Sequence, residues 1–505
     1  MLSPAKRTLV ALVPIGVLTV LLALDIAIFG ADSILGASQV SLLVASGVCI
    51  ALSGWLYKAP WKDFERAIAR NLGEVAPAII ILFLIGAISG TWTMSGVVPA
   101  FICYGIKLIS PKVFLLTSCV LCAVVSLMTG SSWTTIATVG VALIGIGHAE
   151  GFSDAMTAGA IISGAYFGDK ISPLSDTTVM ASSINRVGLF DHIHYMYLTT
   201  VPSIAVTLVI FTVLGLTHAG VPDARMDFYS EVLSSQFHIT PWLLLVPAFT
   251  IWLILRKKPA IVVLALSVVV AAAAALVFQP EVVRGIGAEA TDGSPLRLGF
   301  TGVVRMIFDT VSLDTGSPEV NPLVSSRGML GMMNTVFLIL CAVCFGGCMR
   351  SSGMIDDLSR ILRPLTRTRA GLVGSTVVTG TVLNGIVSDQ YLSILLTSDI
   401  YRDSYEKDGY EARLLSRSVE DSATVTSPLV PWSSCGMTQA TILSVPTLAY
   451  APFCFFCMIS PLMSFLMALI GWKILRRPLA SSPPDATPSS SPAPTGDLPP
   501  GAPQQ

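Results

Sequence analysis

A cluster of charged and polar residues interrupts an apolar stretch in the first half of the sequence. Residues 155–167 are largely apolar, whereas residues 168–176 contain Asp169, Lys170 and Asp176 together with two serines and a proline. Charged side chains are costly inside a membrane, so ionisable residues in such a stretch indicate a functional site by default. A buried carboxylate can hold a hard cation when ionised and a proton when neutral, but not both. The alternative is a solvated loop at a membrane surface.

Three further polar breaks follow apolar runs of the sequence. They lie near residues 129–135, 384–390 and 416–431. Hydroxyl and amide side chains can supply oxygens there or satisfy backbone groups that a broken helix leaves free. The residues that we expect to provide oxygens or charges at these breaks are Thr129, Ser131, Ser132, Thr134, Asn384, Asp389, Arg417, Glu420 and Asp421.

Composition defines the class of protein that must position these residues. The chain has 505 residues, of which 53% are hydrophobic and only 12% are charged, whereas soluble domains carry about 25% charge. Several apolar runs reach the ~20 residues needed to cross a bilayer. The net charge of −1 excludes a nucleic-acid binder. Ten cysteines include CxxC pairs, but these lie in apolar runs, where cysteine serves as a small apolar residue. We predict an all-α polytopic membrane protein with about 10–12 membrane segments.

Lysine- and arginine-rich segments indicate the orientation in the membrane. Such segments occur at residues 58–70, 256–258, 350–369 and 473–477, and excess positive charge marks the cytoplasmic side. We therefore expect a multi-pass protein of the cell inner (plasma) membrane with both termini in the cytoplasm. Residues 280–328 are expected to form a long external segment. The group Asp191, His192 and His194 is expected in a surface loop, and the Pro/Ser-rich residues 479–505 in a disordered cytoplasmic tail.

The chain divides into two membrane halves, residues 1–230 and residues 231–478. The first half carries the breaks near 129–135 and 168–176, and the second carries those near 384–390 and 416–431. Thr129 and Asp169 recur as Thr381 and Asp421 at an offset of 252 residues, and matching spans cross in opposite directions. This pattern is typical of inverted-topology repeats with discontinuous helices, which place substrate and ion sites at the interface of the repeats.

Three motifs also carry a resemblance to a known family. They are Gly130-Ser-Ser-Trp-Thr-Thr135, Gly164-Ala-Tyr-Phe-Gly-Asp-Lys-Ile-Ser-Pro-Leu-Ser-Asp-Thr-Thr178, and Leu415-Ser-Arg-Ser-Val-Glu-Asp421 leading to Pro431-Trp. Together they resemble the NhaC-type Na⁺/H⁺ antiporters, over residues 70 to 475. The resemblance implies inverted repeats with re-entrant hairpins and secondary transport driven by ion gradients. The family includes Na⁺/H⁺ antiporters and a Na⁺-coupled malate/lactate exchanger.

The expected function is therefore Na⁺(Li⁺)/H⁺ antiport, with Asp169, Asp421, Asp389 and Asp176 as ion- or proton-binding carboxylates. We expect Na⁺ at Asp169, Asp421, Ser132 and Asn384, and no cofactor beyond the transported ions. The alternative is an ion-coupled exchanger of small carboxylates or amino acids, for which Lys170 or Arg417 would bind the anion. The lipid bilayer is the expected partner, and a homodimer is compatible with the sequence. An enzyme is not expected, because neither HExxH nor GxSxG occurs.

Lys170 and Arg417 introduce a second interpretation of the carboxylates. Lys170 adjoins Asp169, and Arg417 lies four residues before Asp421, a spacing that allows an ion pair on a helix. Opposite charges favour the ionised carboxylate and so oppose proton exchange. If both aspartates are locked in such pairs, Asp389 is the better proton carrier, because it has no basic neighbour in the sequence.

Overall fold

The computed structural model describes residues 4–29, 36–57, 60–218, 223–256, 258–355, 357 and 368–474. Within these residues the chain is helical except for loops and one two-stranded antiparallel sheet, β1 (Val311–Ser312) and β2 (Ser325–Ser326). In the described parts of the chain, eight helices are long and apolar enough to cross a membrane, and the number rises to 11 if each of three bent helix pairs is one span. These findings confirm the predicted all-α polytopic membrane class with discontinuous helices. The expected tail, residues 479–505, lies outside the described residues.

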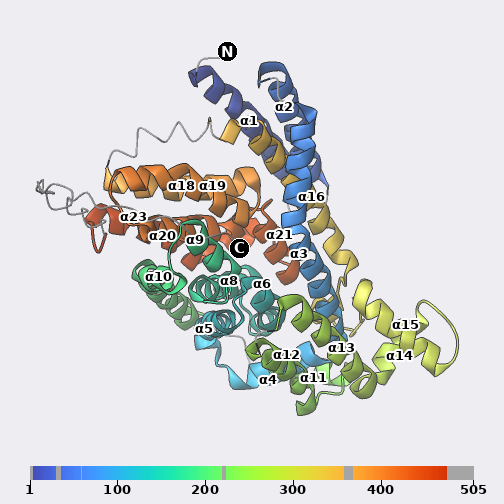
Figure 1. The fold of residues 1–505 in the computed structure, drawn as a ribbon. Coiled ribbons are helices and arrows are strands. Elements are labelled where there is room, and N and C mark those ends of the chain that lie inside the picture. The colour runs from blue at the N-terminus through green and yellow to red at the C-terminus, as the bar shows by residue number, and fades with distance from the viewer. Residues whose placement is uncertain are drawn as a thin grey trace, which may run out of the picture.

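The elements follow one another as long helices separated by short breaks (Figure 1). Those of the first half are α1 (Pro4–Phe29), α2 (Ala37–Leu52) with the π-helical turn η2 (Ser53–Tyr57), α3 (Trp61–Met94), α4 (Val97–Leu108), α5 (Pro111–Thr129), α6 (Ser132–Thr135), η3 (Ile136–Gly140), α7 (Val141–Ala149), α8 (Asp154–Ile171), α9 (Asp176–Ile184) and α10 (Leu189–Thr217).

The elements from residue 223 onward are also mainly helices separated by short breaks. They contain α11 (Asp223–Gln236), η4 (Pro241–Leu244), α12 (Leu245–Leu255), α13 (Ala260–Phe278), α14 (Pro280–Ala288), α15 (Pro295–Phe308), β1, η5 (Asn321–Val324), β2, η6 (Leu330–Met332), α16 (Met333–Ser351), α18 (Arg369–Val387), α19 (Gln390–Lys407), α20 (Ala412–Val419), η8 (Glu420–Thr424), η9 (Ser427–Leu429), α21 (Ser434–Leu443), α22 (Thr447–Tyr450), η10 (Ala451–Phe453) and α23 (Phe455–Ile470).

The two breaks of the first half lie against each other. Helix α5 ends at Gly130, whose φ of +66° is a left-handed conformation that favours glycine. A Cβ at Gly130 would also overlap the backbone of Leu174 in the second break. That break begins later than residue 168, because α8 continues to Ile171 and Pro173 disfavours helix only at the residue before it. Asp169 and Lys170 therefore lie on the last turn of α8 rather than in a loop.

Helices α5 and α8 pack closely because glycine replaces larger residues between them. A Cβ on Gly164 or Gly168 would overlap the carbonyl oxygen of Cys119 or Ala123, respectively. Small residues one turn apart let membrane helices approach to backbone contact. Ser126 Oγ then donates a hydrogen bond of 2.6 Å to the carbonyl oxygen of Ala165 across this contact.

The helix boundaries repeat at an offset of 258 residues rather than 252. Helices α5 and α18 differ by 258 at both ends (369 − 111 and 387 − 129), and α8 matches the run of helical elements from Ala412 to Leu429 by the same difference (412 − 154 and 429 − 171). The hydrogen bond from Ser126 to Ala165 has its equivalent in the 2.7 Å bond from Asn384 Nδ2 to the carbonyl oxygen of Ala423. The offset expected from identical residue types was thus wrong by six residues, and Asp169 corresponds to Ser427 instead of Asp421.

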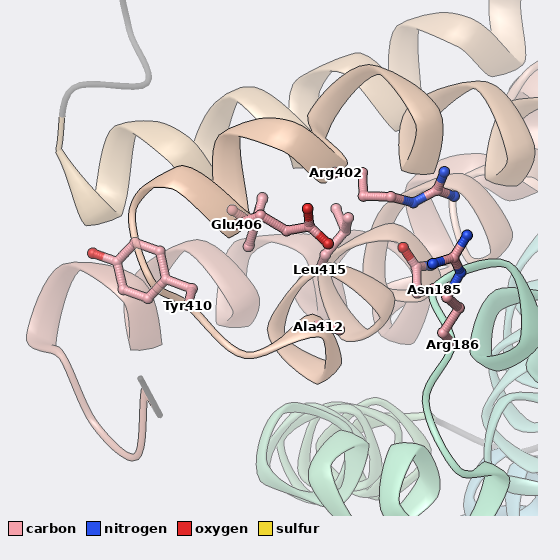
Figure 2. Close-up of a pocket in the computed structure, with 8 residues that line it drawn as sticks. Asn185, Arg186, Arg402, Glu406, Tyr410, Ala412 and Leu415 are labelled. Carbon is pink, nitrogen blue, oxygen red and sulfur yellow. The ribbon is translucent and has the colours of Figure 1, made fainter. Parts of the chain in front are cut away.

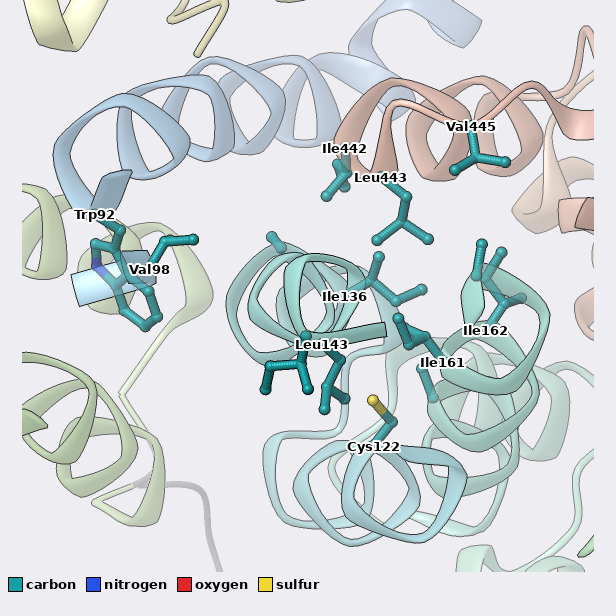
Figure 3. Close-up of a cluster of buried hydrophobic side chains, with 14 of the residues drawn as sticks. Trp92, Val98, Cys122, Ile136, Leu143, Ile161, Ile162, Ile442, Leu443 and Val445 are labelled. Carbon is teal, nitrogen blue, oxygen red and sulfur yellow. The ribbon is translucent and has the colours of Figure 1, made fainter. Parts of the chain in front are cut away.

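Apolar side chains fill the contact between the two halves. In Figure 3, Ile442, Leu443 and Val445 of the second half face Ile136 and Ile161 of the first. All five are buried in one cluster. The cluster lies next to the break near residues 129–135, because Ile136 directly follows that break.

A fully buried carboxylate follows the span Ser132–Ala149. Both carboxylate oxygens of Glu150 lack a hydrogen-bond partner, and burial raises the pKa of Glu150 to about 8. The folded protein then keeps a proton that the unfolded chain loses above its pKa of about 4.3. Stability should therefore fall as the pH rises from about 4.5 to about 8.

Glu150→Gln is expected to flatten this pH dependence and to stabilise the protein at pH 8, on the order of 3–5 kcal/mol. Thermal unfolding of the purified protein between pH 5 and pH 9 measures both effects. Glu281→Gln is the matched control, because the Glu281 side chain is 85% exposed. An unchanged slope in Glu150→Gln would show that the folded protein ionises this carboxyl group.

Candidate functional site

Asp169 is held by the start of the short helix α6. Its Oδ2 accepts hydrogen bonds from the backbone N–H of Ser132 at 3.1 Å and from Ser132 Oγ at 2.7 Å. Ser131 caps this helix by accepting a hydrogen bond from the N–H of Thr134. A helix N-terminus with free N–H groups favours a negative charge. Asp169 is 6% exposed, so these bonds join the two breaks of the first half around one buried carboxylate.

Lys170, the next residue, reaches across to the second half. Its ammonium group forms a buried ion pair with Asp421 Oδ1 and donates a 2.8 Å hydrogen bond to Ser460 Oγ. Thr199 and Ser460 also donate to this oxygen, at 3.0 and 3.2 Å. The structure therefore places Asp421 with Lys170, and not beside Asp169 as a second open carboxylate. Lys170 thus pairs with Asp421 and not with its sequence neighbour Asp169, the pair that the second interpretation of the sequence considered.

Arg417 provides a second cation beside the same carboxylate. Its Nε lies 3.8 Å from Asp421 Oδ2, and its guanidinium group stacks on the ring of Tyr195 at 4.6 Å. The side chain is fully buried, yet none of its three nitrogens has a hydrogen-bond partner. The i,i+4 pair expected from the sequence is therefore present, but without a direct hydrogen bond.

Glu420, the residue before Asp421, is a further buried carboxylate of the second half. It is fully buried, and its Oε1 accepts a 3.1 Å hydrogen bond from Thr177 of the first half. Its Oε2 and the hydroxyl of Thr424, one turn along, have no hydrogen-bond partner. Glu420 also interacts electrostatically with Lys170 and Asp169. It lies in the π-helical turn η8, a distortion that is frequent at functional sites.

The remaining candidates have local roles in the breaks. Asp389 caps α19, because its Oδ1 accepts from the N–H of Leu392 at 3.0 Å, and its Oδ2 accepts from Ser434 at 3.3 Å. The amide nitrogen of Asn384 donates a hydrogen bond to the carbonyl oxygen of Ala423, and its Oδ1 has no hydrogen-bond partner. Thr129, Ser131 and Thr134 bond to one another and to the adjacent backbone. Asp176 is exposed at the start of α9.

His192 was not identified as part of this region by the sequence. Asp191, His192 and His194 lie on the first turns of α10, not in a surface loop, and His192 is fully buried. Its Nδ1 lies 2.9 Å from Ser416 Oγ of the second half. His192 also interacts electrostatically with Lys170 and Asp421. The 224 residues between His192 and Ser416 explain why spacing alone could not reveal this contact.

A pocket of about 160 Å³ opens beside the cluster, between α9, α19 and α20. Figure 2 shows the guanidinium groups of Arg186 and Arg402 on one side of it and Glu406 near its centre. Tyr405 lines the pocket and interacts electrostatically with Arg417. The pocket therefore lies on the side of the buried cluster where Arg417 is found.

A charged centre enclosed by broken apolar helices is the arrangement of an ion-coupled membrane transporter rather than of an enzyme. Two overlapping parts of the chain, residues 3–185 and 164–472, match the Na⁺/H⁺ antiporter family. The chain belongs to this family.

Characterised relatives cover most of the chain. The Na⁺/H⁺ antiporter NhaC of Alkalihalophilus pseudofirmus is 35% identical over 429 residues, which are 85% of this chain and 89% of that protein. The malate-2H⁺/Na⁺-lactate antiporter of Bacillus subtilis is 33% identical over 78% of this chain and 81% of its own length. The arginine/ornithine antiporter ArcD of Halobacterium salinarum is 31% identical over 94% of both chains.

Proposed function

We propose that this protein exchanges Na⁺ or Li⁺ for protons, and that Asp169 and Glu420 form its exchange site together with Thr177 and Thr424. The observation that carries the proposal is a pair of buried carboxylates on different halves. The charge of Asp169 acts on Glu420, and neither carboxylate has an ion-pair partner among the described residues. Asp421, by contrast, is held by Lys170 and Arg417.

The chemistry of the exchange site follows from its oxygens. When both carboxylates are ionised, they and the two threonine hydroxyls offer a hard cation the oxygen ligands that it requires. When both are protonated, they are neutral and offer the cation little attraction. Burial penalises the state with two bare negative charges, because desolvation and like charge both disfavour ionisation. The site therefore holds either the cation or protons, which is the exclusion that antiport requires.

The ion pair between Lys170 and Asp421 supports this division of roles. Lys170 lies next to Asp169 in the chain, and its ammonium group would neutralise the exchange site if it turned towards Glu420. Asp421 and Ser460 bind this ammonium group instead, and Thr199 donates a hydrogen bond to the same oxygen of Asp421. In this mechanism Asp421 is a positioning residue that keeps an internal cation away from Asp169 and Glu420.

A small carboxylate or amino acid is the second candidate for a substrate. Two relatives are named as antiporters of such compounds, and the buried guanidinium group of Arg417 has no hydrogen-bond partner. Arginine is suited to bidentate recognition of carboxylates. We place this candidate second, because the carboxylates Glu420 and Asp421 lie on the same helical run and would repel an organic anion.

The same proposal includes the orientation of the protein and its repeats. The positive segments of the sequence support an orientation with both termini in the cytoplasm and the protein in the cell inner membrane. The common offset of 258 residues supports two repeats, which we propose to be inverted with respect to the membrane. Residues 1–230 and 231–478 remain the proposed halves.

Purified protein in proteoliposomes with an internal pH dye tests the exchange directly. With an imposed proton gradient and no organic solute, addition of Na⁺ or Li⁺ should move protons, whereas K⁺ should not. Empty liposomes are the control. Proton movement that requires a carboxylate or amino acid, with no response to Na⁺ or Li⁺ alone, would overturn the proposal in favour of organic-substrate exchange.

A further inference from the structure

Helices α14 and α15 form a hairpin that projects sideways from the end of α13 (Figure 1). Glycines bring the two helices together, since a Cβ on Gly287 or Gly302 would overlap a backbone carbonyl of the other helix. Arg305 joins them further by donating a 2.8 Å hydrogen bond to the carbonyl oxygen of Ile286 and pairing with Glu289 at 2.8 Å. The hairpin is therefore a firmly packed unit and not a loose external loop.

The same unit is fixed to the membrane helices. Gly90 of α3 lies so close to the carbonyl oxygen of Met306 that a Cβ there would overlap it. On α15, the face that packs inward consists of Gly299, Gly302 and Met306, all of which are buried. This contact fixes which face of α15 points away from the protein.

The outward face of α15 is an apolar stripe. Leu296, Phe300, Val304 and Phe308 recur at every fourth residue and are 85%, 71%, 38% and 38% exposed. Side chains four residues apart lie on one face of a helix. Large apolar side chains gathered on one exposed face indicate an interaction surface. A helix with one buried and one exposed apolar face requires a second apolar environment on its outer side.

The inward face of α15 begins against exposed apolar residues at the end of α13. A Cβ at Gly299 would lie 3.8 Å from Leu276 of α13, and Leu276 and Val277 are themselves 47% and 69% exposed. Helix α13 is a candidate membrane span, so its exposed apolar residues face acyl chains. Because α15 begins against this end of α13, its apolar stripe starts at the level where the candidate span ends. Arg297 is exposed at the same end of α15.

We propose that the α14–α15 hairpin lies in the membrane interface, with its apolar stripe in the acyl chains of the leaflet at the end of α13. Arg297 then extends its charged head towards the lipid phosphates while its stem follows the apolar surface. Amphipathic helices with large apolar and cationic residues bind membranes in this orientation. The external segment expected at residues 280–328 thus begins as a membrane-bound hairpin, and this conclusion is independent of the transported ion.

Site-specific photocrosslinking tests the proposal on the full-length protein in phospholipid nanodiscs. Benzoylphenylalanine replaces Phe300 in one variant and the exposed Asp292, on the turn between the helices, in a control. After irradiation, mass spectrometry should find phospholipid adducts at position 300, at least about tenfold more abundant than at position 292. Thermal unfolding of both variants checks that they are folded.

Two results would overturn the proposal. Crosslinks from position 300 to a second copy of the chain would assign the stripe to a dimer interface. A folded variant that yields neither lipid nor protein adducts at position 300 would place the stripe in water. Because the assay needs no ion gradient, its failure would not bear on cation exchange.

Discussion

Glu420→Gln abolishes Na⁺-dependent proton movement in the proposed mechanism, and Asp169→Asn does the same. Each substitution keeps the size of the side chain but removes a negative charge and a titratable proton. A site with one remaining carboxylate offers the cation fewer charged oxygens and exchanges one proton fewer. The proteoliposome assay with the pH dye measures the loss, and binding of Na⁺ by isothermal titration should be lost with it.

Asp176→Asn is the matched control for these two variants. Asp176 is a neighbouring carboxylate of the same break but is exposed at the start of α9. We expect its exchange rate to stay within about twofold of the original protein. If Glu420→Gln retains Na⁺/H⁺ exchange and Asp389→Asn loses it, the proton carrier is Asp389 and not Glu420.

Breaking the ion pair between the halves should have the largest effect on stability. Lys170→Met leaves Asp421 without its ammonium partner, and Asp421→Asn leaves a buried ammonium group without its carboxylate. Removal of one partner of a buried pair costs about 3–5 kcal/mol, because the other charge remains desolvated. Both single variants should therefore unfold at clearly lower temperatures in detergent. The double variant Lys170→Met/Asp421→Asn should recover part of that loss, because Lys170 is then replaced by an apolar residue while the buried Arg417 still lacks the neighbouring carboxylate.

The same double variant distinguishes a positioning role of Asp421 from a direct role of Asp421 in ion exchange. If Asp421 only holds Lys170 away from the exchange site, the double variant recovers Na⁺/H⁺ exchange together with stability. Asp421→Asn alone should lower the apparent affinity for Na⁺, since the released ammonium group competes for Glu420. A stable double variant without exchange would show that Asp421 itself carries the ion or the proton.

The sequence predicted the class of protein and the places where its helices break, because both depend on local composition. Apolar runs of membrane length and the polar residues between them identify spans and breaks without reference to distant residues. Pro173 also marked the end of α8 to within a few residues. The candidate site followed from the same reasoning, because charge inside an apolar chain is rare and costly.

The partners within the site could not be predicted in this way. Lys170 and Asp421 are 251 residues apart, and the choice between the adjacent Glu420 and Asp421 depends on how the turn η8 directs each side chain. The repeat offset failed for a related reason. Identical residue types suggested an offset of 252 residues. The helix boundaries and a hydrogen bond repeat instead at an offset of 258 residues, which aligns unlike residues such as Asp169 and Ser427. Pro173 and Pro431 share the correct offset and were the available signal.

The glycine contact between α5 and α8 has a consequence for selectivity. Backbone packed against backbone leaves α5 and α8 no room to slide, so Asp169 on α8 and Ser132, which follows α5, would keep their relative positions during the proposed exchange. Glu420 belongs to the other half and can change its distance from Asp169. In the proposed antiporter, the spacing between halves would then determine which ionic radius fits, so that Na⁺, Li⁺ and K⁺ are distinguished by how far the halves close.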